Sequence, residues 1–475
     1  MKNFGRRNFL KVTAATAAIA SVPKQVVGLA SDSPSGEVSV WTTSGSQRHA
    51  SQPSLRFEPQ QNGTAPNAIV IDPSERFQEL VGFGAAFTDA ACFTLHRLDP
   101  AVRSELFRKF FHESELNLSA SRVCIGASDY SRNAYSYSEG SEPDPGLNRF
   151  SIEHDREYIL PVLREARAVN PELWLLASPW SPPGWMKFNS SMLGGSMRRK
   201  WLAAYAKYFG KFLDAYAAEG VKINSVTPQN EVDTDQDGRM PACIWPQEYE
   251  IEFVRDHLGP MLQKSANPAD IWILDHNYNL WGRAICELED PGAQKYIKGI
   301  AWHGYVGSPD AMTHVKKHFP KTDMFWTEGG PDFDTPGYET EWTKWSQQFT
   351  GILRNWARAV IAWNYALDED GNPNIGPFHC AGLVTVHSKS RAVIYSGQYW
   401  AMEHYARHLR RGAVVLKSAG EIKDVSHVVA RNTSGKYAAV LTNGNKSAVP
   451  VALVVGNSRL TTTLPPDSVT SLEWA

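Results

Sequence analysis

Residues 223–233 read Ile-Asn-Ser-Val-Thr-Pro-Gln-Asn-Glu-Val-Asp, an apolar and β-branched run that ends in a proline and then presents Asn230 and Glu231. This is the pattern of a buried parallel strand whose C-terminal end carries chemistry. Alone, the stretch leaves a second interpretation equally open, in which Glu231 caps the segment that follows. A second carboxylate favours the first interpretation. Glu328 lies 97 residues later, in Asp-Met-Phe-Trp-Thr-Glu-Gly-Gly over residues 323–330.

The middle of the chain alternates between strand-like and helical patterns. Residues 199–213 have apolar side chains at the i, i+3, i+4 spacing of a helix. Eight strands mostly alternating with helices over roughly 290 residues are the number and size of a (β/α)₈ barrel. A doubly wound open sheet is the alternative, but no Gly-x-Gly-x-x-Gly motif follows the first strand. We therefore predict an α/β protein with a TIM barrel over residues 76–408. Its expected strands are Leu80–Phe87, Leu118–Gly126, Leu173–Pro179, Ile223–Pro228, Ile271–His276, Gly299–His303, Asp323–Thr327 and Ala359–Tyr365.

The two ends of the chain are rich in short β runs instead. Two such runs, residues 37–43 and 68–71, precede the barrel, and six more follow between residues 413 and 474, separated by turn residues. This spacing is typical of an antiparallel β-sandwich. We predict that the N-terminal strands, within residues 31–75, join the C-terminal segment 409–475 in one β-sandwich side domain.

The N-terminus has the pattern of an export signal. Arg6 and Arg7 stand ahead of Phe9-Leu10-Lys11, an alanine-rich stretch follows, and small residues lie at 28 and 30. Residues 1–30 resemble a twin-arginine export signal rather than a merely basic start. They are too short and too alanine-rich for a membrane-spanning helix. We expect a periplasmic or secreted protein without stable membrane insertion.

Composition excludes several classes of function. The net charge of −2 provides no field that would attract nucleic acid. The five cysteines form no Cys-x-x-Cys pair, and the 14 histidines form no His-Glu-x-x-His motif. A metal-dependent hydrolase is therefore disfavoured, and we expect neither a metal nor a cofactor. The 11% of aromatic residues fits the binding of sugar rings, although a large barrel core needs such residues too.

Glu231 and Glu328 are expected to face one pocket. On the strand count above they end the fourth and seventh strands, and three βα units of ~31–36 residues account for their spacing. Two carboxylates flanking a cavity are the minimal requirement for breaking a glycosidic bond. Asn230, placed to bond a sugar hydroxyl, favours Glu231 as acid/base. Glu328, followed by two glycines that permit close approach, is then the nucleophile.

Five motifs resemble glycoside hydrolase family 30, whose members include glucosylceramidase and related β-glycosidases. The resemblance runs from about residue 68 to the C-terminus, and the family's fold agrees with the barrel and side domain predicted above. Two departures, Ala85 and Val232, stand beside the motifs where many members have glycine and proline. The motifs are Gly-Phe-Gly-Ala-Ala-Phe-Thr-Asp-Ala-Ala (82–91), Ser-Pro-Trp-Ser-Pro-Pro-Gly-Trp-Met-Lys (178–187), Pro-Gln-Asn-Glu (228–231), Trp-Thr-Glu (326–328) and Ala-Trp-Asn-Tyr (362–365).

The resemblance implies a retaining mechanism, for which the two carboxylates lie ~5–5.5 Å apart. It also implies sugar contacts at Asp89, Trp180, Asn230 and Trp363. The alternatives without a role in sugar binding are a helix cap for Asp89 and core packing for the two tryptophans. Tyr305, after the sixth strand, is a candidate to hydrogen-bond the nucleophile, whereas His303 is equally well explained as a satisfied histidine at the barrel rim.

These observations predict a retaining exo-acting β-glycosidase of the glucosylceramidase or β-glucosidase type, acting on a carbohydrate or glycolipid. An endo-acting polysaccharide hydrolase such as a β-1,6-glucanase is the alternative within the family. A non-catalytic sugar-binding barrel is disfavoured because both glutamates are present. The loops 129–150 and 233–246 decide between exo and endo action, and their sequence does not reveal their path. The sequence leaves the sugar, the aglycone and the oligomeric state open.

Overall fold

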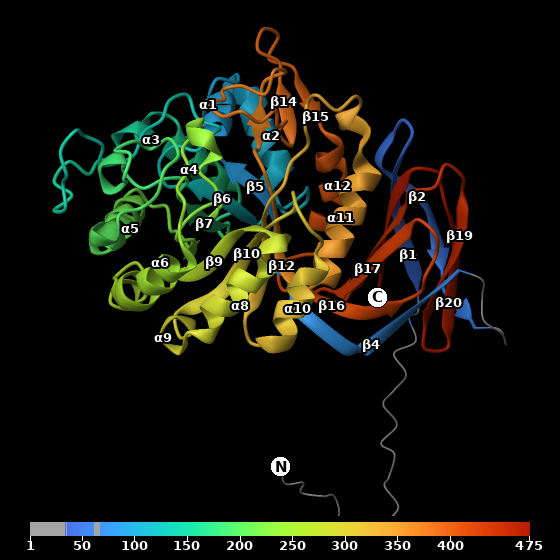
Figure 1. Cartoon of the computed structure of the whole chain (residues 1–475). Helices are drawn as coiled ribbons and strands as arrows, with labels where there is room; N and C mark the ends of the chain where they lie inside the picture. Colours follow the sequence, from blue (N-terminus) through green and yellow to red (C-terminus); the bar gives the residue numbers. More distant parts are fainter. Residues whose placement is uncertain (1–33, 35, 61–66) are drawn as a thin grey trace, which may run out of the picture.

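All eight predicted barrel strands are present in the computed structural model, which describes residue 34, residues 36–60 and residues 67–475 (Figure 1). Each strand pairs in parallel with its two neighbours, and the last pairs back to the first, so the sheet is closed. The (β/α)₈ barrel is therefore confirmed, and the open doubly wound sheet is excluded. The strands are β5 (Gly82–Phe87), β6 (Ala120–Cys124), β7 (Trp174–Ser178), β8 (Ser225–Val226), β9 (Asp270–Asn277), β10 (Ile297–His303), β11 (Asp323–Glu328) and β12 (Ala357–Ala362).

Amphipathic helices surround the barrel. The helix predicted over residues 199–213 is α5 (Leu202–Ala218), and it buries Tyr205, Phe209, Phe212 and Tyr216 at spacings of three and four residues. Thr88 and Asp99 cap the two helices that follow β5 by accepting hydrogen bonds from backbone amides. The other helices are α1 (Asp89–His96), α2 (Pro100–Phe111), α3 (Glu153–Glu157), α4 (Ile159–Val169), α6 (Gln247–Glu252), α7 (Gly259–Gln263), α8 (Trp281–Glu289), α9 (Pro291–Gln294), α10 (Asp310–His318), α11 (Trp342–Arg354) and α12 (Gly397–Ala406).

Both chain ends build the side domain, as predicted (Figure 1). Its strands follow one hydrogen-bonded order, β2-β1-β21-β18-β17-β16-β4-β19-β20-β3. Strands from both halves of this order contribute side chains to one apolar core. The pairing is antiparallel except between the C-terminal strand β19 and the N-terminal strand β4, which run parallel. The strands are β1 (Glu37–Ser44), β2 (Gln47–Arg56), β3 (Glu58–Pro59), β4 (Ala68–Glu79), β16 (Val414–Ala419), β17 (Val425–Arg431), β18 (Tyr437–Asn443), β19 (Val449–Val455), β20 (Ser458–Leu464) and β21 (Ser468–Trp474).

Helices α11 and α12 lie between the barrel and the side domain (Figure 1). Buried hydroxyl and imidazole groups fix this junction. Ser346 hydrogen-bonds Thr442 at 2.6 Å, and His404 bonds Thr43 and Ser471 at 2.8 and 2.7 Å. The predicted export signal lies outside the described residues. Among the described helices, none combines the length and the apolar character that crossing a bilayer requires. A small sheet of β13 (Ala366–Leu367), β14 (Val384–Val386) and β15 (Val393–Tyr395) completes the fold.

Gly84 in β5 provides a test of the barrel packing. A Cβ atom at this position would lie 1.9 Å from the backbone oxygen of Ala120 on β6, which cannot move without opening the barrel. We expect Gly84→Ala to destabilise the protein by about 1–3 kcal/mol or more, as overpacking does. Gly282 in α8 is the matched control, since nothing lies within 4 Å of its Cβ position. Gly282→Ala should stabilise by about 0.5–1 kcal/mol. Denaturant unfolding of the two variants measures both effects, and equal stabilities would contradict the barrel packing.

Candidate active site

Glu231 and Glu328 line one cavity of about 490 Å³ at the C-terminal ends of the barrel strands. This is the end at which TIM barrels carry their sites, and the volume is within the range of ~300–1,000 Å³ of small-molecule sites. The loops after β8, β11 and β12 form its walls. The remaining lining residues are Asp129, Trp180, Thr234, Gln236, Met240, His276, Asn277, Tyr305, Gly330, Pro331, Asp332, Trp363, Phe378, His379 and Cys380.

Glu231 is held in a strained backbone conformation. Its φ of +54° lies in the left-handed region, which costs energy for a residue with a side chain, and such strain clusters at functional sites. Its backbone amide donates to the Asp275 carbonyl at 3.0 Å, and its Oε2 accepts from Gln236 Nε2 at 3.1 Å. The side chain is only 14% exposed. The cap interpretation of Glu231 is not what the structure shows, because its carboxylate faces the cavity.

Glu328 is buried between a cation and a hydroxyl donor. Arg122 donates to its Oε2, and Tyr305 donates to its Oε1 at 3.1 Å. The hydrogen bond predicted for Tyr305 is thus present. Charge-assisted hydrogen bonds of this kind stabilise an ionised carboxylate and fix its direction.

Arg122 organises the floor of the site, and sequence reasoning missed it. It lies fully buried on β6, where its guanidinium bonds Glu328, the Asp275 carboxylate at 2.6 Å and the Asn230 oxygen at 2.7 Å. Its Cζ also lies 4.6 Å from the centre of the Trp180 ring. The available signal was an arginine inside an otherwise apolar strand pattern, because such a charge is buried only with partners.

The surroundings of the two glutamates shift their pKa values in opposite directions. Burial raises the pKa of Glu328, against the opposing effects of His303 and Arg122. Burial would also raise the pKa of Glu231, but the neighbouring imidazoles of His303 and His276 hold it below its usual value. His303 is buried, yet its carboxylate neighbours raise its pKa to about 9.

A distortion in β9 brings Asp275 and His276 to the site. Leu274 and Asp275 have φ values of +71° and +45°, and the pairing of β9 with β10 skips one residue there. The bulge lets Asp275 bond Arg122 and His303 inside the barrel while His276 still lines the cavity. His303 Nδ1 lies 3.4 Å from Glu231, and its Nε2 lies 3.8 Å from Glu328, so one imidazole spans the distance between the carboxylates.

Of the residues predicted to contact the sugar, Trp180 and Trp363 line the cavity, whereas Asn230 is buried beside Arg122 and is not one of the lining residues. The two indoles stack with centres 5.1 Å apart, and both line the cavity while remaining almost fully buried. Arg122 donates to Asn230 Oδ1 at 2.7 Å, and the backbone amide of Asn230 donates to the Pro179 carbonyl at 2.8 Å, so Asn230 is fixed beside the site.

Asp89 does not reach the cavity, which corrects the sugar contact predicted for it. Its carboxylate accepts hydrogen bonds from the Arg132 amide, from Tyr158 and from His154, so it braces α1 against the following loop. The cap interpretation is also incorrect, since Thr88 caps α1. Asp129 is the aspartate in the cavity. It is 4% exposed, and its Oδ1 has no hydrogen-bond partner among the described residues.

The two aspartates should respond differently to the same substitution. Asp129→Asn replaces one carboxylate oxygen in the cavity wall by an NH₂ group, and we expect kcat/KM to fall roughly 10- to 100-fold with little change in stability, because Asp129 Oδ1 has no partner among the described residues. Asp89→Asn should instead lower stability by about 1–3 kcal/mol, because its partners inside the protein lose their acceptor. Steady-state kinetics and thermal unfolding of both variants distinguish these effects. An Asp89→Asn enzyme with normal stability and impaired substrate binding would restore the original prediction.

Two carboxylates in one barrel cavity, with aromatic walls and no other reactive group required, define a glycoside hydrolase. Comparison with known proteins gives the family. The family model for the glycosyl hydrolase family 30 TIM-barrel domain matches residues 80–409, and that for the glycosyl hydrolase family 30 beta sandwich domain matches residues 412–472. The chain therefore belongs to glycosyl hydrolase family 30, which makes it an enzyme rather than a silent sugar-binding barrel.

The similar proteins include both endo-1,6-beta-glucanases and glucosylceramidases. An endo-1,6-beta-D-glucanase of Neurospora crassa is 31% identical over 86% of this chain and 90% of its own length. The lysosomal acid glucosylceramidase of Mus musculus is 28% identical over 81% of this chain and 79% of its own. A solved endo-beta1,6-glucanase structure superimposes with a TM-score of 0.85 at 28% identity, covering 93% of this chain and all of that one.

Proposed function

We propose that this enzyme hydrolyses β-glucosidic bonds with retention, with Glu328 as nucleophile and Glu231 as acid/base. The observation that supports this order is the difference between the two carboxylates. Both oxygens of Glu328 accept from fixed donors, Arg122 and Tyr305, which orient an ionised group for attack. Glu231 is the more exposed, at 14% against 6%, as befits a group that must reach a departing chain.

The reaction balances with these two groups alone. In the first step Glu328 attacks the anomeric carbon, the glycosidic bond breaks, and Glu231 gives its proton to the leaving oxygen. In the second step Glu231 removes a proton from water, the water oxygen bonds to the anomeric carbon, and Glu328 is released. A sugar in the cavity removes water from Glu231, and this desolvation raises its pKa against the effect of His276 and His303.

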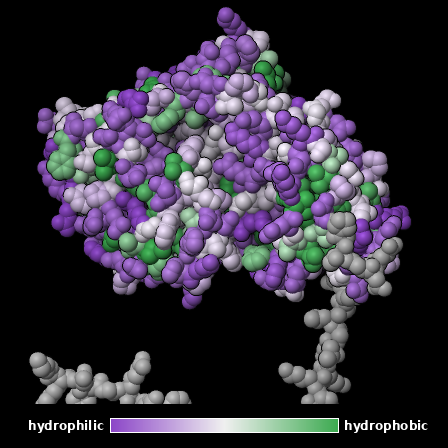
Figure 2. Space-filling view, turned by 45° about the vertical axis from the view of Figure 1, so that its right-hand side comes forward, coloured by the Kyte–Doolittle hydropathy of each residue, from purple (hydrophilic) through white to green (hydrophobic). Residues whose placement is uncertain are grey.

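For the substrate we propose an internal bond of a β-1,6-linked glucan. The Neurospora crassa relative and the solved structure described above carry endo-1,6-glucanase names; the Neurospora crassa enzyme is 31% identical, against 28% for the glucosylceramidase. Tyr305 and Phe378 line the cavity yet are 45% and 41% exposed, so their rings are available to further sugar units outside the reaction centre. On the face in Figure 2 the hydrophobic residues form separate patches rather than one continuous surface. The exo-acting glucosylceramidase type predicted from the sequence is the second candidate.

A time course of the reaction products distinguishes the endo-acting glucanase from the exo-acting glucosylceramidase type. The mature enzyme is incubated with linear β-1,6-glucan, glucosylceramide and an aryl β-glucoside, and early products are sized by chromatography. We expect oligosaccharides of several lengths from the glucan before glucose accumulates, and a β-anomer as the first product by NMR. Glucose as the sole product from the start, or turnover of glucosylceramide alone, would overturn the endo proposal. A first-formed α-anomer would overturn retention.

A further inference from the structure

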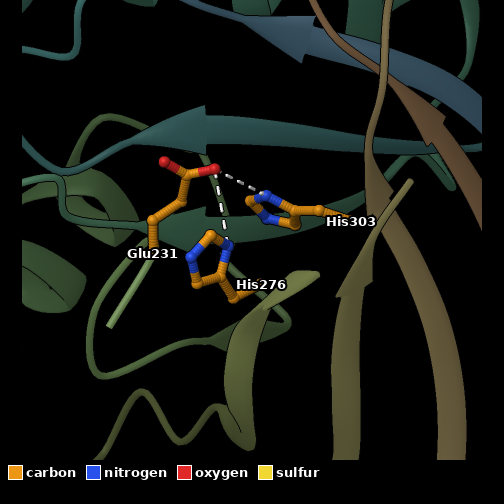
Figure 3. Close-up of side chains that lie close together, drawn as sticks. All are labelled: Glu231, His276 and His303. Carbon is orange, nitrogen blue, oxygen red and sulfur yellow. Dashed lines mark ion pairs between the residues drawn. The ribbon is translucent and has the colours of Figure 1, made fainter. Parts of the chain in front are cut away.

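Two imidazoles and one carboxylate converge on a single point in the cavity wall (Figure 3). His276 Nδ1 lies 3.5 Å and His303 Nδ1 lies 3.4 Å from the same oxygen, Glu231 Oε1. All three atoms lie within 4.8 Å of one another. We call these residues the imidazole–carboxylate cluster. They come from β9, β10 and the segment after β8, so the barrel, not the local sequence, brings them together.

Ordinary hydrogen bonding does not explain the cluster. Hydrogen bonds from nitrogen to oxygen span about 2.7–3.2 Å, and both contacts are longer. Neither His276 Nδ1 nor His303 Nδ1 has a hydrogen-bond partner among the described residues, although both atoms are buried. The two histidines are only 6% and 0% exposed. Buried nitrogen atoms without partners are costly, so their common direction toward Glu231 has to be explained.

The two separations from Glu231 Oε1 fit the edges of a metal coordination tetrahedron. With bonds of ~2.0–2.1 Å to nitrogen and oxygen, two ligand atoms of a tetrahedral zinc site lie about 3.3–3.4 Å apart. The two measured contacts, 3.4 and 3.5 Å, match this value. Two imidazole nitrogens and one carboxylate oxygen suit zinc and its neighbours among the divalent transition metals, and not magnesium or calcium, which prefer oxygen alone.

The remaining nitrogen of each imidazole is held as in known metal sites. His276 Nε2 lies 2.7 Å from Asp233 Oδ1, and His303 Nε2 lies 3.0 Å from Asp275 Oδ1. Carboxylates in this position fix the tautomer that leaves Nδ1 free to bind a metal, and they increase its basicity. Since Glu231 and His276 line the cavity, an ion can reach the cluster from solvent.

We propose that Glu231, His276 and His303 bind one divalent transition metal ion of the zinc type, and that the bound ion inhibits the enzyme. Inhibition follows because the ion occupies Glu231 Oε1, which can then no longer carry the proton for the leaving group. This second part rests on the role proposed above for Glu231. The binding itself does not depend on that role.

Metal binding is tested directly on the tag-free full-length protein after dialysis against chelator. Calorimetry at pH 8 with ZnCl₂ should give one ion per chain, and CoCl₂ should produce the visible absorption of a tetrahedral site. His276→Gln should weaken zinc binding at least 10-fold. Asp233→Asn, which alters only the partner of His276, should weaken it about 10- to 100-fold. His379→Gln is the matched control, because His379 lines the same cavity outside the cluster and should bind as wild type.

The outcomes separate the two parts of the proposal. No zinc binding by the wild type, or unchanged binding by a folded His276→Gln and by Asp233→Asn, would overturn the site. Zinc should also inhibit hydrolysis of an aryl β-glucoside in the wild type, with full recovery on adding EDTA, and should inhibit Asp233→Asn at correspondingly higher concentration. Zinc bound at the cluster without inhibition of an active enzyme would overturn the inhibitory role. Absence of hydrolysis without any metal would instead contradict the proposed function and leave the binding result standing.

Discussion

Glu328→Gln is expected to reduce kcat by roughly 10⁴-fold or more, because the amide cannot replace the carboxylate that attacks the sugar carbon. The variant keeps the size of the side chain: its amide oxygen can accept from Arg122, and its NH₂ group can donate to the Tyr305 oxygen. The free energy of unfolding of Glu328→Gln should therefore stay close to that of the wild type. Steady-state kinetics on an aryl β-glucoside measure the loss, and activity within tenfold of wild type would contradict the assignment.

Chemical rescue distinguishes the two glutamates from each other. In Glu328→Ala, added azide can occupy the vacated nucleophile position and should give a glycosyl azide of inverted, α, configuration. In Glu231→Ala the nucleophile is intact, so azide attacks the covalent intermediate and should give the retained β product. NMR of the products reads out the configuration. The opposite pairing of variants and products would reverse the roles of Glu231 and Glu328.

Arg122→Met should be the most destabilising single substitution in the site, by about 3–5 kcal/mol, because it leaves buried carboxylates without their cation. Asp275 is fully buried, and although burial opposes it, the Arg122 charge helps to hold its pKa well below the usual value. Activity should also fall sharply, since the orientation of Glu328 is lost. Arg122→Lys keeps the charge but not the forked geometry, so it should recover only part of the stability.

Arg108→Met provides the surface control for that measurement. Arg108 pairs with Glu105 and Glu115 on the exposed face of α2, where solvent screens the charges. The unfolding midpoint of Arg108→Met in denaturant should remain near that of the wild type, while the midpoint of Arg122→Met should fall clearly. Equal midpoints for the two variants would show that Arg122 does not organise the site.

The barrel strands and the glutamate pair were predictable because local patterns encode them. Apolar runs bounded by turns locate strands, and the regular length of βα units relates Glu231 to Glu328. The parallel pairing of β19 with β4 was not predictable, because it joins segments almost 400 residues apart, and no local signal fixes their direction.

The roles of individual side chains in the site could not be predicted from the sequence, because they depend on where each side chain points in the folded protein. The motif around residue 89 drew attention to Asp89, but its carboxylate turns toward Tyr158 and His154, and Asp129 faces the cavity instead. His276 and His303 lack any spacing typical of metal ligands, since they belong to separate strands and meet only through a bulge in β9. Sequence spacing detects ligands on one element, and this cluster uses three.

The proposed mechanism requires that Glu328 forms a covalent bond to the sugar. Incubation with an activated 2-deoxy-2-fluoro-β-glucoside should slow the breakdown of the glycosyl-enzyme and allow the adduct to accumulate at one per chain. Proteolysis and mass spectrometry then locate it. The structure predicts the label on Glu328, within the β11 sequence Asp323–Glu328, and none in Glu328→Gln. A label on Glu231 or on any other residue, or stoichiometric labelling of Glu328→Gln, would contradict the account.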